Sequence, residues 1–321
     1  MKIYSFVKKC TLVLICAAIV YGLGRLYFAV TAGFTIGNIT STLAYDPHWD
    51  THALSSDEKH AIEQALNQEY VYLGRGCQAY VFASLDGNYV IKFFKYQRFR
   101  TQRWIDLFTF LPSVNAYQQE KAIEKQTKLH KVFRSWKIAY EYLKEQTGVV
   151  FVHLNKSTDW SKQIVIRDKL GLTHQLDLGQ MEFLLQRRAN MLCPTLEAMM
   201  NEGQEKQSYD VLDRLVAMLL SEYAHGFADN DHALMQNTGV LDGNPIHIDV
   251  GQFIYNDIVK SPKIYQQELY DKTYKLRQWL EQRYPELAYH LKARLLAILG
   301  IDYFYMGPYV HKGDVAKIPH Q

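Results

Sequence analysis

The sequence predicts an α+β protein with two lobes behind an N-terminal apolar helix, and three observations lead to this prediction. An uncharged run from Cys10 to Gly24 stands near the start of the chain. Residues 70–95 form short apolar runs separated by Gly and Asp-Gly turns, the pattern of an antiparallel meander. Residues 114–145 and 209–224 carry apolar side chains at helical spacing. We therefore expect an antiparallel β-sheet in the first lobe and a mainly helical second lobe.

The composition is that of a folded protein with no nucleic-acid partner. With 321 residues, of which 48% are hydrophobic and 21% charged, the chain can bury a large core. The 23 Tyr and 15 Phe exclude disorder over most of it. A net charge of +3, without a basic stripe interleaved with aromatics, gives no basis for nucleic-acid binding. Four cysteines without a Cys-x-x-Cys pair predict neither a disulfide framework nor a zinc site.

Residues 1–34 are expected to form a single-pass transmembrane anchor. Arg25 interrupts the apolar run, which continues from Leu26 to Phe34, and a terminal arginine can extend its charge to the membrane surface, so about twenty residues are available to span. A cleaved signal peptide stays open, because Val30-Thr31-Ala32 has the small-residue pattern that a signal peptidase accepts. Lysines precede the run and aspartates follow it, so the positive-inside rule places the body on the non-cytoplasmic side.

Beyond this anchor we expect residues 35–56 to form a linker, residues 57–188 the first lobe and residues 189–321 the second. The boundary at 188 follows from a strand that ends near Gln186 and a helix that begins at Pro194.

The meander contains a candidate anion site. Gly74 and Gly76 stand in its first turn, where the missing Cβ lets backbone amides approach phosphate oxygens. Lys92 in the third strand is flanked by Val90-Ile91 and Phe93-Phe94, and an ammonium among apolar neighbours needs an anion. The alternative is an edge lysine that extends from the sheet into water.

A second candidate site lies between Asn237 and Asp249. Two short apolar pieces, Gly239–Leu241 and Ile246–Ile248, flank a turn at Asp242-Gly243-Asn244, the signature of a hairpin. A tight hairpin brings its ends together, so Asn237 would lie beside Asp249. An amide oxygen and a carboxylate form a hard-oxygen site suited to Mg²⁺, which also keeps waters and takes phosphate oxygens.

Together these motifs resemble the protein-kinase-like phosphotransferases, a group that includes protein, aminoglycoside and lipopolysaccharide-sugar kinases. Asn237 matches the metal-holding Asn of that family, and Asp249-Val250-Gly251 matches its Asp-Phe-Gly, with Val for Phe. Lys92 closes a Val-Ile-Lys element similar to Val-Ala-Ile-Lys, and the glycine turn resembles the glycine-rich loop, with Ala79 in place of the third glycine. The resemblance covers roughly residues 70–255.

The resemblance implies further roles that the spacing leaves open. In the family the catalytic Asp stands five residues before the Asn. Here Asp231 stands six before Asn237 and Asp229 eight before it, so Asp231 is the first candidate and Asp229 the second. The family also pairs the lysine with a Glu from the following helix, for which Glu124 is preferred over Glu120.

The expected function is that of a membrane-tethered kinase, in which ATP and Mg²⁺ bind and a phosphoryl group passes to a hydroxyl acceptor of unknown kind. The first alternative is a pseudokinase that acts as a nucleotide-binding or scaffold module, favoured by Ala79 and by the altered Asp spacing. A third class is a metal-dependent hydrolase that uses Asp229, Asp231 and either His225 or His247.

Overall fold

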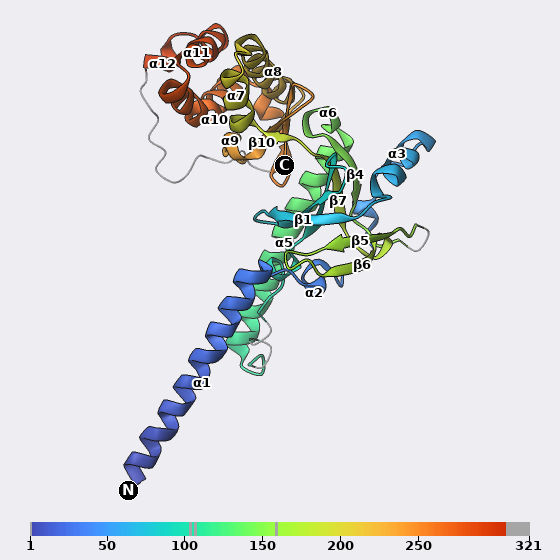
Figure 1. The fold of residues 1–321 in the computed structure, drawn as a ribbon, viewed down its shortest axis with the longest axis vertical. Coiled ribbons are helices and arrows are strands. Elements are labelled where there is room, and N and C mark those ends of the chain that lie inside the picture. Colours follow the sequence, from blue (N-terminus) through green and yellow to red (C-terminus); the bar gives the residue numbers. More distant parts are fainter. Residues whose placement is uncertain (1, 103–104, 106–107, 158–159, 306–321) are drawn as a thin grey trace. The chain divides into compact units, whose positions relative to one another are not determined.

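The computed structural model describes residues 2–102, 105, 108–157 and 160–305, and within them the chain forms two compact units (Figure 1). Unit 1 contains residues 1–45, 56–100 and 155–183, and unit 2 contains residues 46–55, 101–154 and 184–321. The division differs from the expected boundary at 188, because residues 101–154, which contain the long helix after the meander, cluster with the C-terminal part.

Groups of helices and groups of strands follow one another along the chain. The α-helices are α1 (Lys2–Thr31), α2 (Ile36–Ile39), α3 (Ser56–Leu66), α5 (Pro112–Glu141), α6 (Lys144–Thr147), α7 (Leu192–Asn201), α8 (Glu205–Ala224), α9 (Leu234–Asn237), α10 (Pro262–Arg283), α11 (Pro285–Leu299) and α12 (Asp302–Tyr305). The strands are β1 (Tyr70–Arg75), β2 (Ala79–Ser84), β3 (Tyr89–Phe94), β4 (Val149–His153), β5 (Gln163–Arg167), β6 (Thr173–Asp177), β7 (Phe183–Arg187), β8 (Asn190–Met191), β9 (Phe227–Asp229), β10 (Thr238–Leu241), β11 (Asn244–His247) and β12 (Phe253–Tyr255). The 3₁₀ turns are η1 (Pro47–Trp49), η2 (Tyr96–Arg98), η3 (Leu178–Gln180) and η4 (Asp257–Lys260).

Within unit 1, five sheet strands lie in the order β3-β2-β1-β5-β6. The expected antiparallel meander is confirmed over β1, β2 and β3. The sheet is not wholly antiparallel, because β1 pairs with β5 in parallel before β5 turns back into β6. Tyr80, Phe82 and Phe93 are fully buried and form the aromatic core of this sheet.

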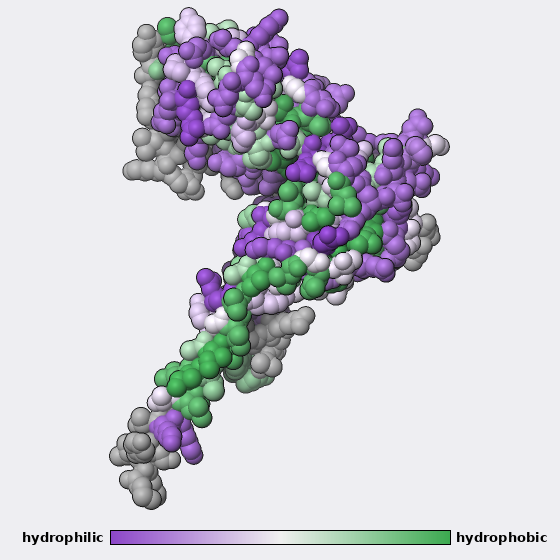
Figure 2. Space-filling view, in the orientation of Figure 1, coloured by the Kyte–Doolittle hydropathy of each residue, from purple (hydrophilic) through white to green (hydrophobic). Residues whose placement is uncertain are grey.

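Helix α1 has the length and composition of a membrane span. Its segment Thr11–Thr31 has a mean hydropathy of 2.0 and none of its most apolar stretch is buried, so an apolar surface runs along the helix (Figure 2). The chain leaves α1 directly into the core of unit 1, where the Phe34 ring lies 5.3 Å from the rings of Tyr80 and Phe82. The expected linker, 35–56, therefore contains folded structure, namely α2 and η1.

Unit 2 is mainly helical. Helices α8, α10 and α11 pack together around buried leucines such as Leu215, Leu276 and Leu291. A three-stranded sheet of order β11-β10-β8 and a two-stranded ladder of β9 with β12 lie within the same unit, and α5 packs on β12. The fold is thus a mixed arrangement of β-sheets and helices, with the candidate catalytic segments carried by the short strands of unit 2.

Candidate functional site

The glycine turn of unit 1 has an open backbone. It joins β1 to β2 and is closed by a hydrogen bond of 2.9 Å from the Gly76 N–H to the Ala79 carbonyl. A Cβ placed on Gly74 or on Gly76 would meet no described atom within 4 Å. Packing among the described residues therefore does not demand glycine at either position. The glycines leave a turn without a Cβ at these two positions, so a phosphate could approach its backbone closely, although the Gly76 N–H is already bonded to the Ala79 carbonyl.

Lys92 lies in the middle of β3, opposite Val81 of β2, and only 9% of it is exposed. A lysine that is this buried pays a desolvation cost that an anion offsets. The structure thus places Lys92 and the glycine turn in the same unit, at β3 and at the β1–β2 connection respectively.

Two basic residues that the sequence motifs did not mark hold the glycine turn. The Lys95 ammonium donates a hydrogen bond to the Gly76 carbonyl and lies 4.9 Å from the centre of the Tyr80 ring. Arg98 donates to the Cys77 carbonyl at 2.8 Å. Burial, and after it the neighbouring cations Arg75 and Arg98, lower the pKa of Lys95 from 10.5 to about 8. No motif of the sequence identifies Lys95, because its role depends on how the chain folds back after β3.

The two glutamates expected to pair with Lys92 lie on α5, which belongs to unit 2. The Glu124 carboxylate binds two lysines of its own helix, Lys121 at 2.7 Å and Lys128 at 2.5 Å. These hydrogen bonds, the one from Lys121 first, lower the pKa of Glu124 to about 2. Glu120 is exposed to solvent. In this structure Glu124 is thus part of a surface lysine cluster on its own helix.

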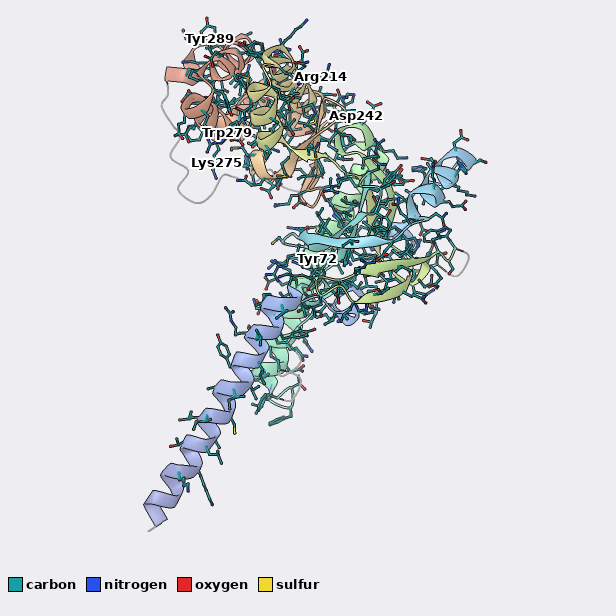
Figure 3. All side chains as sticks on the ribbon, in the orientation of Figure 1. Tyr72, Arg214, Asp242, Lys275, Trp279 and Tyr289 are labelled. Atoms are coloured by element: carbon teal, nitrogen blue, oxygen red, sulfur yellow. The ribbon has the colours of Figure 1, made fainter. Side chains whose placement is uncertain are left out.

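The expected hairpin between Asn237 and Asp249 is confirmed. Strands β10 and β11 pair from Thr238 opposite His247 to Leu241 opposite Asn244. The turn between them is Asp242-Gly243, with φ values of 51° and 77°, as a two-residue type I′ turn requires. Arg214 of α8 donates to the Gly243 carbonyl at 3.1 Å and so fixes the turn, as its proximity to Asp242 in Figure 3 illustrates.

The open end of this hairpin brings Asn237 to the residue that precedes Asp249. The Ile248 N–H donates to the Asn237 carbonyl at 2.7 Å, one step beyond the last strand pair. Asp249 is exposed, and its Oδ1 accepts a hydrogen bond of 3.1 Å from the Gly251 N–H. The predicted hairpin thus brings the backbone of Asn237 to Ile248, the residue before Asp249.

The donor set at the hairpin end fits Mg²⁺. The Asn237 Nδ2 atom is buried and has no hydrogen-bond partner among the described residues. Because the two ends of an Asn amide are assigned from their hydrogen bonds, the flipped amide would present Oδ1 there instead. Within the described part of the chain no three His, Cys, Asp or Glu residues gather as a metal site. One amide oxygen and one carboxylate are the sparse protein ligand set that Mg²⁺ takes beside waters and phosphates.

Asp229 and Asp231 have different surroundings. Asp229 ends β9 and is 2% exposed; the Lys272 ammonium donates to its carbonyl at 2.7 Å and lies 3.5 Å from its Oδ2. Asp231 is half-buried, and Gln252 donates to its Oδ2 at 3.1 Å. The carboxylate of Asp229 is thus part of a buried charge pair with Lys272. The carboxylate of Asp231 is instead oriented by a hydrogen bond from Gln252, which lies three residues after Asp249 in the sequence.

His247 is a further buried polar group of unit 2. Its Nε2 lies 2.8 Å from Glu222 Oε1, and its Nδ1 lies 3.9 Å from Asp229 Oδ2. His247 is 1% exposed, and His225 contacts a backbone carbonyl, that of Ser221, at the end of α8. The two histidines of the hydrolase alternative therefore have other contacts: His247 bonds Glu222 in the core, and His225 lies at the end of α8.

Ser135 of α5 ties down the segment after Asp249. Its hydroxyl donates to the Val250 carbonyl and accepts from the Phe253 N–H, each at 2.6 Å. Ser135 is fully buried, and Phe253 in turn pairs with Asp229 across the β9–β12 ladder. One side chain on α5 thus fixes the backbone that carries Asp249 relative to the strand that carries Asp229.

Comparison with known proteins returns only distant structural similarity. No protein-family profile matches the chain, and no curated protein matches it. The solved structures it resembles include monomeric WbdD, with 17% sequence identity over 69% of this chain and 44% of that chain and a TM-score of 0.34. A second crystal structure of WbdD gives 14% identity, 72% and 47% coverage and a TM-score of 0.35.

A third structure, described as the bifunctional kinase-methyltransferase WbdD, gives 14% identity, 71% and 46% coverage and a TM-score of 0.33. The chain thus spans less than half the length of the WbdD chains that it resembles. At TM-scores this low the similarity does not assign the chain to a family.

Proposed function

We propose that the protein is an ATP- and Mg²⁺-dependent phosphotransferase that acts on a hydroxyl and is tethered to a membrane by α1. The observation that supports this most is the hairpin of unit 2, which carries Asn237 to the residue before Asp249. Asp231 is linked to the same segment through Gln252. An amide, an exposed carboxylate and an oriented second carboxylate are the groups that metal-assisted phosphoryl transfer uses.

The proposed chemistry consists of positioning and charge neutralisation. The backbone of the turn at Gly74 and Gly76 and the ammonium of Lys92 hold the phosphates of ATP. Asn237 and Asp249 would hold Mg²⁺, which when bound neutralises charge on the transferred phosphoryl group. Asp231 orients the acceptor hydroxyl and accepts its proton, while Asp229 is retained as the partner of a buried lysine.

A pseudokinase is the second candidate. The spacing of six residues between Asp231 and Asn237 departs from the family by one, and Ala79 replaces the third glycine of the loop. Such a protein would bind nucleotide without turnover.

The test measures Mg²⁺-dependent hydrolysis of ATP, and phosphoryl transfer to the protein itself, by the full chain in lipid nanodiscs. Lys92→Ala and Asp249→Asn should each abolish turnover. Matched controls are Lys59→Ala on α3 and Asp210→Asn on α8, both at exposed positions, and these should retain it. ATP binding without turnover in the wild type supports the pseudokinase. Hydrolysis of phosphoesters in the absence of nucleotide would support the metal-dependent hydrolase and reject both the phosphotransferase and the pseudokinase.

A further inference from the structure

The turn between β5 and β6 exposes two leucines. The strands end at Arg167 and restart at Thr173, and in the turn between them Leu170 is 48% exposed and Leu172 57% exposed. Turns of soluble surfaces are normally built from small and polar residues. Leu170 and Leu172 thus form a small apolar patch on a turn, a position that polar residues usually occupy.

This turn has a fixed shape. The Asp168 Oδ1 atom accepts the N–H groups of Leu170 at 2.9 Å and of Leu172 at 3.0 Å. His174 Nε2 lies 2.9 Å from Asp168 Oδ2, and Gly171 takes the positive φ of 82° that closes the turn. The two leucines are thus held outward by hydrogen bonds, which lowers the entropy cost of placing them in a partner.

The turn lies beside the last turn of α1. The Lys169 ammonium donates to the Ala29 carbonyl at 2.9 Å, and Ala29 belongs to the apolar segment Thr11–Thr31. Strands β5 and β6 accordingly stand next to the upper end of α1 in Figure 1. If α1 spans a bilayer, Leu170 and Leu172 stand at the level where the hydrocarbon ends and the headgroups begin.

Basic side chains bind the end of α1 and the segment that follows it, Lys169 and Arg75 at the helix end itself. Four of them donate hydrogen bonds to backbone carbonyls between Ala29 and Ser41, namely Lys169, Arg75, Arg100 and Lys156. Among the described residues none of the four forms an ion pair with a carboxylate. Positive charge is therefore concentrated where the apolar helix ends, which favours anionic lipid headgroups.

We propose that the β5–β6 turn is a second membrane contact, in which Leu170 and Leu172 enter the bilayer interface while Lys169 and Arg75 bind phosphates of anionic phospholipids. This inference rests on the proposed anchoring by α1 and does not require phosphoryl transfer. Arg75 stands between Gly74 and Gly76, and its guanidinium lies 4.5 Å from the centre of the Phe28 ring. The glycine turn is consequently held at the membrane surface.

The experiment measures the depth of spin labels on the full chain in nanodiscs of phosphatidylcholine and phosphatidylglycerol. In a background with all four cysteines replaced by serine, labels are placed singly by Leu172→Cys, Leu85→Cys and Ile19→Cys. Leu85 is 62% exposed in the β2–β3 turn of the same unit, and Ile19 is 55% exposed within the apolar segment. Accessibility to oxygen and to a water-soluble nickel chelate is read by power saturation.

The inference predicts that the ratio of oxygen accessibility to nickel-chelate accessibility is severalfold higher for the labels at 172 and 19 than for the label at 85. Lys169→Glu, or nanodiscs without phosphatidylglycerol, should reduce that preference at 172 and leave the label at 19 unchanged. A label at 172 as accessible to the nickel chelate as that at 85, with 19 still in lipid, overturns the inference and leaves the anchor intact. Nickel access at 19 would overturn the anchor and the inference together. Neither outcome depends on turnover of ATP.

Discussion

Replacing Lys272 with methionine removes the cation that neutralises the buried carboxylate of Asp229. Both side chains are at most 2% exposed, and the ammonium lies 3.5 Å from Oδ2 and 2.7 Å from the carbonyl of Asp229. At that separation the attraction is about 5 kcal/mol for an effective dielectric constant of about 20, before desolvation is subtracted. Because the substitution leaves an uncompensated buried charge, we expect the free energy of unfolding to fall by about 3–5 kcal/mol.

The assay is urea unfolding of the full chain in nanodiscs, followed by tryptophan fluorescence. Lys275→Met is the matched control, because Lys275 is exposed on the same helix (Figure 3). Combining Lys272→Met with Asp229→Asn should recover most of the lost stability, since no charge then remains buried. If Lys272→Met costs no more than Lys275→Met, or if the double variant is no more stable than the single one, the structural assignment of Asp229 is wrong.

Three further predictions concern the segments around the candidate site. Ser135→Ala should lower the free energy of unfolding by about 2–4 kcal/mol, because two buried backbone groups lose their partner; denaturant titration measures this, and an unchanged midpoint contradicts it. Gly239→Ala should cost about 1–3 kcal/mol in the same assay, because its Cβ would lie 2.7 Å from the Ala189 Cβ and 2.9 Å from the Asn190 carbonyl. ATP affinity should fall as pH rises through about 8, because Lys95, which binds the Gly76 carbonyl of the glycine turn, then loses its charge. Calorimetric titration with ATP across that pH range should show the loss of affinity in the wild type and not in Lys95→Arg. A wild-type affinity that does not change with pH would contradict this role of Lys95.

The parts of the fold that sequence reasoning predicted are those fixed by local turns. The meander and the β10–β11 hairpin follow from Gly and Asp-Gly turns, which determine which strands pair and in which register. The parallel pairing of β1 with β5 was not predicted, because it joins Tyr70 to Ile166 across a long stretch of chain. The same holds for α5, whose packing on β12 places it with unit 2.

The candidate site was predictable to the same degree. That Asn237 meets the backbone before Asp249 follows from the hairpin alone. The difference between Asp229 and Asp231 was not visible, because it depends on Lys272, which lies 43 residues further along the chain. The spacing of the motifs likewise did not predict the role of Lys95, because its contact with the glycine turn forms only when the chain folds back after β3.

The most direct test of the proposed function is the thermal stability of the full chain with ATP, with and without Mg²⁺. We expect ATP to raise the melting temperature of the wild type only when Mg²⁺ is present. Asp249→Asn should remove the dependence on Mg²⁺, and Lys92→Ala should remove the shift itself. A melting temperature that ATP and Mg²⁺ leave unchanged, or a shift that persists in both variants, would contradict the proposal that these residues bind the nucleotide and its metal.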